Sequence, residues 1–270
     1  CLALGVGVGS LVWTSPITFV ASANCALYCG ADLDFVDIDP HTYNLSVEQL
    51  TKKLAAAERD GCLPDVVIPV HLTGQSCDMR AIHRLSQRYG FRIIEDASHA
   101  IGAAYEGRPV GSCDFSDIVV FSFHPVKIVT TGEGGCAVTR SAELAAAMEL
   151  LRSHGITRDA AKMTCPPDGG WYYQQIALGF NYRMTEIQAA LGISQMQRLS
   201  AFIARRRQLA GQYVTMLEHL PVTLPYQADN SESAWHLFII RLHEQYGKNK
   251  SAIFDELRRS GIGVNLHYIP

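Results

Sequence analysis

The chain has 270 residues, of which 48% are hydrophobic and 18% are charged, and its formal net charge is -3 at pH 7. This apolar content with so little net charge excludes a disordered chain, and 23 Lys and Arg against 26 Asp and Glu disfavour nucleic-acid binding. A chain of this length can bury about 75% of its unfolded surface, so neither disulfides nor a metal is needed to hold a core.

The cysteines and the first residues bear on the compartment. The eight cysteines include no C-x-x-C pair, which favours free thiols in a reducing, cytoplasmic compartment. Residues 1–31 carry no charge, but polar residues and glycines interrupt them, so we expect neither a membrane span nor a signal peptide. Because the chain starts at Cys1, we expect it to be a fragment whose beginning lies upstream.

Short apolar segments alternate with helical patterns in the first half of the chain. Ser46 and Gln49 form the capping box of one predicted helix, and a second helix begins at Asp78 and ends at Gly90. The pattern predicts an α/β fold with a mainly parallel sheet that is covered on both faces. The predicted strands are Leu33–Val36, Asp65–Val70, Phe91–Glu95 and Asp117–Phe123.

The second half contains more helix. A loop over residues 156–175 holds three consecutive aromatic residues, and a loop of this length is usually functional. We expect a large domain over residues 1–200 and, over 201–270, a linker helix with an incomplete small α+β domain. Further strands are predicted at Cys136–Thr139, at Ala234–Leu242 and from Val264 to Leu266, and helices at Ser141–His154, at Thr185–Leu220 and at Lys248–Ser260.

Chemically reactive side chains follow two of the predicted strands. Asp96 and His99 follow one strand, His124 and Lys127 follow the next, and a glycine-rich turn comes after them. Ligands of open α/β sheets bind at this edge. A lysine in an apolar setting has a lowered pKa and can form an imine with an aldehyde, while an acid can pair with a pyridinium nitrogen. Each residue alone has a commoner structural explanation, but the combination is typical of pyridoxal phosphate sites.

These runs resemble the DegT/DnrJ/EryC1/StrS family of pyridoxal-phosphate-dependent sugar aminotransferases, which have the aspartate aminotransferase fold. The runs that carry the resemblance are Glu95–Ala100, Phe121–Lys127, Gly132–Gly135, Thr14–Phe19, Gly179–Glu186 and Asn265–Tyr268. Within the family, Ser153–Arg158, Trp171–Gln175 and the run before Lys127 resemble the branch that serves pseudaminic acid synthesis. That branch aminates C4 of a UDP-linked 4-keto-6-deoxy N-acetyl sugar.

The resemblance implies roles for the residues that would hold pyridoxal phosphate. Lys127 would form the imine and move the proton, and Asp96 would pair with the pyridine nitrogen. Phe19 would stack on the ring, and His99 would contact its phenolic oxygen. Ser122 would bind the phosphate.

The resemblance also implies a homodimer, because Asn181 would reach the phosphate in the partner subunit. L-Glutamate would be the amino donor, and no metal, nucleic acid or membrane is expected as a partner. The implied substrate-binding residues are Arg183, His267 and Tyr268. In the family a helix N-terminus completes the phosphate site. Since Cys1–Leu4 looks like the tail of that helix, we expect this stretch alone to bind the cofactor poorly.

Four alternatives remain at this point. A nicotinamide enzyme is disfavoured because the glycine pattern after Gly5 has Ser10 where a dinucleotide loop needs glycine. Dehydratases of the family carry histidine in place of the lysine, whereas Lys127 is present here. The fold could also serve a non-catalytic binding or regulatory protein. The main alternative is an aminotransferase that acts on another nucleotide ketosugar.

Overall fold

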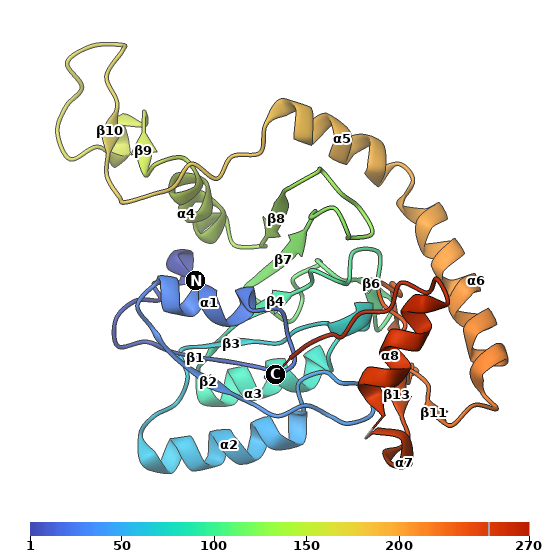
Figure 1. Ribbon diagram of the computed structural model, residues 1–270. Helices are drawn as coiled ribbons and strands as arrows, with labels where there is room; N and C mark the ends of the chain where they lie inside the picture. Colours follow the sequence, from blue (N-terminus) through green and yellow to red (C-terminus); the bar gives the residue numbers. More distant parts are fainter. Residues whose placement is uncertain (248, 270) are drawn as a thin grey trace.

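The computed structural model describes residues 1–247 and 249–269, with a six-stranded sheet at its centre (Figure 1). The strand order is β2-β1-β3-β4-β7-β8. Neighbouring strands from β2 to β7 are parallel, and β8 pairs with β7 in the antiparallel sense. This confirms the predicted α/β fold with a mainly parallel sheet. The strands are β1 (Leu11–Thr14), β2 (Asp32–Phe35), β3 (Val66–Ile68), β4 (Arg92–Asp96), β7 (Ile118–Ser122) and β8 (Gly135–Val138).

Helices cover both faces of the sheet. On one face, α2 (Val47–Asp60) and α3 (Met79–Tyr89) pack against Trp13 and Ile93. On the other face, α1 (Ala21–Tyr28) and α4 (Ala142–Arg152) pack against the neighbouring residues Val12 and Ile94. Successive strand residues thus enter opposite cores, which explains why these strands are apolar throughout rather than alternating. Each fully buried aliphatic or aromatic side chain contributes about 1.5–3 kcal/mol to folding.

The helix ends follow the sequence signals closely. The Ser46 hydroxyl accepts a hydrogen bond from the Gln49 N–H, although the reciprocal bond of a full capping box is not formed at this helix. Asp78 caps α3 through the Ala81 N–H, and Gly90 ends α3 in the left-handed conformation. Local capping therefore helps to position α2 and α3, the two helices on one face of the sheet.

The predicted helix over 185–220 is two helices, α5 (Glu186–Met196) and α6 (Leu199–Leu217). The chain turns at Gln197 and Arg198, where neither glycine nor proline marks the break. Ile203 of α6 is buried in a third core cluster with Ala100 and Val129. Packing onto the sheet domain, rather than a local signal, therefore separates the two helices.

The C-terminal part contributes strands to two small sheets. β11 (Val222–Thr223) pairs with β13 (Arg241–Leu242), and β12 (Ser231–Glu232) pairs with β5 (Ala104–Tyr105), which also pairs with β6 (Arg108–Pro109). The helices are α7 (Glu244–Gly247) and α8 (Lys250–Arg259), and the predicted helix start at Lys248 lies outside the described residues.

Two strand predictions in this part were wrong. Of the predicted strand Ala234–Leu242, only the last two residues are strand, because the backbone N–H groups of Ala234 and Leu237 donate to the carbonyls of Gly74 and Thr73 instead of to a neighbouring strand. No strand forms from Val264 to Leu266.

The remaining differences lie in the N-terminal residues and in the long loop. Strand β1 and helix α1 were not predicted, and residues 2–4 form a short 3-10 helix. The loop over 156–175 contains a 3-10 turn, Ala160–Lys162, and its ends pair as β9 (Ile156–Thr157) and β10 (Gln174–Gln175). In Figure 1 this loop extends away from the sheet.

Within the described ranges, no helix is long and apolar enough to cross a membrane.

Candidate active site

The candidate site lies at the carboxyl edge of the parallel strands (Figure 1). Asp96 is the last residue of β4, and the neighbouring strand β7 ends at Ser122 and leads into the turn that carries Lys127. Strand β1 leads into the loop that carries Phe19. Parallel pairing places these three strand ends at one edge, where ligands bind in such sheets.

Hydrogen bonds hold both oxygens of the Asp96 carboxylate. The Ser22 hydroxyl donates to Oδ2 over 2.5 Å, and the Ser98 N–H donates to Oδ1 over 3.0 Å. The Asp96 backbone is fixed as well, since its N–H donates to the Pro69 carbonyl and its carbonyl accepts from the His71 N–H. The carboxylate therefore has a defined direction at the strand end.

Lys127 lies half-buried in the turn after β7, where its N–H donates to the His124 carbonyl over 2.9 Å. Burial lowers the pKa of the Lys127 ammonium, and the nearby negative charge of Asp96 opposes this only in part. A lysine with a lowered pKa has a larger fraction of neutral amine, which is the nucleophilic form.

His99 is buried, with 5% of its surface exposed. The Thr73 N–H donates to its Nδ1 over 3.3 Å, so the ring proton of the neutral imidazole is on Nε2, which lies 3.2 Å from the Tyr268 hydroxyl. Burial, with the positive charges of Lys127 and His267 nearby, lowers the pKa of His99 to about 3. His99 is thus a neutral hydrogen-bond donor at any pH near 7.

Tyr268 adjoins His99, and two more predicted residues, Phe19 and His267, lie beside Tyr268. Burial and the charge of Asp96 raise the pKa of Tyr268 to about 12, so this hydroxyl keeps its proton. The rings of Phe19 and Tyr268 lie 6.3 Å apart between centroids. His267 is half-buried, and burial together with Lys127 lowers its pKa. The structure therefore brings these side chains together with Lys127 and Asp96.

The other predicted site residues are placed differently. The Ser122 hydroxyl accepts the His124 N–H over 3.3 Å at the end of β7. Asn181 and Arg183 are exposed on the segment between β10 and α5, and Asn181 pairs with Ser153 through a backbone bridge. Within this chain these two residues do not join the group around Lys127.

Three residues of the site were not predicted. The His236 ring lies 4.5 Å from the His99 ring between centroids, and burial lowers its pKa to about 2. Ser22 and Thr73 supply the donors to Asp96 and His99. Of these three residues, only His236 has a signal in the sequence, because it is a histidine inside the apolar run that follows Ala234.

The residues present fit pyridoxal phosphate. An amine of lowered pKa, an oriented carboxylate and a neutral imidazole donor lie at one edge of the sheet. The Ser15 hydroxyl, which follows β1, is buried and has no hydrogen-bond partner among the described residues, so it is available to a ligand. In the same residues, no group of three or more His, Cys, Asp or Glu side chains could hold a metal ion.

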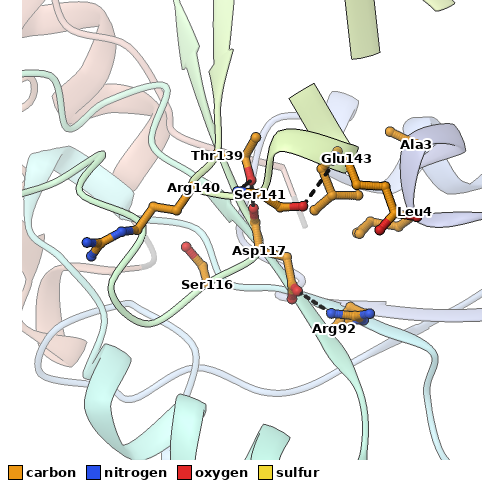
Figure 2. Close-up of a pocket in the computed structure, with 10 residues that line it drawn as sticks. Ala3, Leu4, Arg92, Ser116, Asp117, Thr139, Arg140, Ser141 and Glu143 are labelled. Carbon is orange, nitrogen blue, oxygen red and sulfur yellow. Dashed lines mark hydrogen bonds and ion pairs between the residues drawn. The ribbon is translucent and has the colours of Figure 1, made fainter. Parts of the chain in front are cut away.

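A cavity of about 520 Å³ lies at the opposite edge of the sheet (Figure 2). It is lined by Arg92, the first residue of β4, and by Asp117, which precedes β7. Arg140 and Glu143, near the start of α4, also line it. Arg92 is paired with Asp117 over 2.7 Å. Because it lies away from Lys127, at the other end of the parallel strands, this cavity is not the candidate active site.

Comparisons with known proteins identify the family of this chain. A sequence model of the DegT/DnrJ/EryC1/StrS aminotransferase family matches residues 1–270. The UDP-4-amino-4,6-dideoxy-N-acetyl-beta-L-altrosamine transaminase of Campylobacter jejuni is 36% identical over 262 residues, which are 96% of this chain and 65% of that protein. The GDP-perosamine synthase of Caulobacter vibrioides is also 36% identical, over 97% of this chain and 66% of that protein.

A solved structure agrees with these sequence matches. Helicobacter pylori PseC, an aminotransferase involved in the biosynthesis of pseudoaminic acid, superposes with a TM-score of 0.86 at 31% identity, covering 97% of this chain and 66% of that chain. The chain thus spans about two thirds of the length of these three proteins.

Proposed function

Because the chain belongs to the DegT/DnrJ/EryC1/StrS aminotransferase family, whose cofactor is pyridoxal phosphate, we propose that its protein transfers an amino group to a nucleotide-linked keto sugar. The observation that carries the proposal is the half-buried Lys127, of lowered pKa, beside the oriented Asp96 carboxylate. We propose residues 1–200 as the cofactor-binding domain, and residues 201–270 as a linker helix and part of a small domain.

The cofactor, when bound, supplies a protonated ring that withdraws electrons from the carbon that bears the amine. Asp96 would accept the hydrogen bond of the ring nitrogen and keep it protonated. Lys127 Nζ would take the proton from the carbon that bears the amine and would return it on the cofactor side of the nitrogen. His99 would donate the hydrogen bond of its Nε2–H to the phenolic oxygen. Phe19 would pack on the ring, and Ser122 would bind the phosphate.

The proposed donor is L-glutamate, which leaves as 2-oxoglutarate. The proposed acceptor is a UDP-linked 4-keto-6-deoxy N-acetyl sugar, which Arg183, His267 and Tyr268 would contact. The runs 153–158 and 171–175 and the Campylobacter and Helicobacter relatives support this acceptor. The Caulobacter relative, at the same 36% identity, makes a GDP-linked sugar the alternative to be tested.

We also propose a homodimer in which Asn181 and Arg183 serve the partner subunit. Apolar side chains around them support an interface, since Leu178 and Ile187 are each 85% exposed and Tyr182 is 73% exposed. Mixing K127A with N181A protein should restore activity. After random exchange, roughly half of the dimers are mixed and one of their two sites carries both native residues, so roughly a quarter of all sites are intact. No recovery after subunit exchange would contradict the shared site.

The free cysteines support a reducing, cytoplasmic compartment.

The direct test of function uses the full-length gene product reconstituted with pyridoxal phosphate. L-Glutamate would be incubated with UDP-linked or GDP-linked 4-keto sugars, and 2-oxoglutarate and the amino sugar would be measured. We expect turnover with the UDP sugar, loss of turnover in K127A, and native turnover in K52A, which removes an exposed lysine. Turnover in K127A, or none with any keto sugar, would contradict the proposal.

A further inference from the structure

The His236 ring covers His99. Their ring centroids are 4.5 Å apart with 41° between the planes, and both side chains are largely buried. His236 comes from the C-terminal part of the chain, whereas His99 follows β4 in the sheet domain. Contact between two imidazole rings from such distant segments needs a structure that holds both in place.

One loop holds both histidines. The Thr73 N–H donates to His99 Nδ1, while the carbonyls of Thr73 and Gly74 accept the N–H groups of Leu237 and Ala234. From the other side, the Arg206 guanidinium of α6 donates to the carbonyls of Trp235 (3.0 Å) and His236 (3.2 Å). The backbone at His236 is therefore clamped between this loop and α6.

We propose that His236 is a positioning residue whose ring, tilted against His99, keeps His99 in a single neutral tautomer with Nε2–H directed into the site. In this tautomer, Nδ1 receives the Thr73 N–H, and Nε2 presents its proton toward the Tyr268 hydroxyl and the phenolic oxygen of the cofactor. The part of the proposal that concerns the cofactor rests on the proposed function, but the tautomer of His99 does not.

The charges around the pair favour the same state. Lys127 and His267 face both rings, and Arg206 also faces His236; Asp96 contributes the negative charge on the Tyr268 side. Positive neighbours and burial both disfavour a proton on His99 Nδ1, where it would also oppose the Thr73 N–H. Without the cover of His236, water would reach His99, and the ring could turn and take up a second proton.

The test follows His99 by NMR in protein labelled with ¹⁵N at the histidine rings, without cofactor, between pH 5 and 8, with H99Q to assign its signals. In the native protein we expect the neutral Nε2–H tautomer throughout. In H236A we expect the pKa of His99 to rise, so that His99 titrates in the acidic part of this range, below its ordinary value of about 6.5 because Lys127 and His267 remain. H236F keeps a flat ring over His99 and should behave like the native protein.

Two controls separate positioning from general damage. H83A removes a partly buried histidine of α3 far from the site and should leave His99 unchanged. If H236A does not fold, H236S replaces it, since serine also leaves the space over His99 open. A native His99 signal in H236A or H236S, or a titrating His99 in H236F, would overturn the proposal.

A second readout connects the pair to the cofactor. The visible absorbance of bound pyridoxal phosphate would be recorded against pH in the same variants. We expect the H236A curve to acquire a transition below about pH 6.5 that the native and H236F proteins lack. Unchanged curves would overturn the cofactor part. Native protein that binds no pyridoxal phosphate would contradict the proposed function, while the histidine NMR would still decide the tautomer.

Discussion

Gly74 should be indispensable, because three backbone atoms from two other segments lie close to it. Its φ is +110°, and a Cβ there would lie 2.9 Å from the His99 carbonyl oxygen and 3.0 and 3.1 Å from the nitrogens of Trp235 and His236. All three are backbone atoms and cannot move aside as the end of a flexible side chain can. The G74A variant therefore meets both backbone strain and overpacking.

The expected loss is the sum of two terms. A residue with a side chain held in this backbone region costs about 1–3 kcal/mol, and overpacking of a tight contact costs about 1–3 kcal/mol more. We expect G74A to lose about 2–6 kcal/mol of the free energy of unfolding, which is a large part of the 5–15 kcal/mol, roughly, of a typical protein. The loss would be measured by urea denaturation.

Two other glycines serve as matched controls. Gly61 has a φ of +68° but no atom within 4 Å of an added Cβ, so G61A carries the backbone term alone, about 1 kcal/mol. Gly211 lies within α6 with open space around it, so G211A should stabilise by about 0.5–1 kcal/mol. A G74A variant no less stable than G61A would refute the reasoning.

Three further predictions concern the site and its supports. S22A removes from Asp96 a charge-assisted hydrogen bond worth about 1.5–3 kcal/mol, so affinity for pyridoxal phosphate should fall at least about tenfold in a cofactor titration; native affinity would contradict this. E95A leaves His71 buried without the carboxylate 2.6 Å away, and the free energy of unfolding should fall by about 3–5 kcal/mol in urea; a loss under 1 kcal/mol, roughly, would be too small for a buried pair. Because the pKa of His99 is lowered to about 3, the unfolded chain binds a proton below pH 6.5, roughly, that the folded chain does not. Stability is thus full above that pH and falls on acidification, by up to about 1.4 kcal/mol per pH unit, and H99Q should lose less between pH 6.5 and 4.5, approximately; equal losses would argue against a buried neutral His99.

The strand that ends at Asp96 and the strand that precedes the Lys127 turn could be predicted because their sequence signals are local. Each is a short apolar run that is followed directly by polar residues and a glycine-rich or capped segment. Strand β1 escaped prediction although it lies between β2 and β3. Its four residues sit in a long uncharged stretch where no helix signal or change in polarity marks the boundaries.

The contacts around His99 could not be predicted for a different reason. The run after Ala234 has the apolar composition of a strand, but its N–H groups are bound by the Thr73–Gly74 loop, which is distant in the sequence. The contact of the His236 ring with His99 depends on that pairing and on Arg206. Tertiary contacts between distant segments leave no periodicity that a sequence can display.

The measurement that tests the central claim most directly identifies the lysine that holds the cofactor. The full-length gene product would be incubated with pyridoxal phosphate, reduced with borohydride, digested and analysed by mass spectrometry. We predict a single pyridoxyl adduct on Lys127 that is absent from K127A, with K52A as the control. An adduct scattered over exposed lysines, or none at all, would contradict the assignment of Lys127 and with it the proposed aminotransferase site.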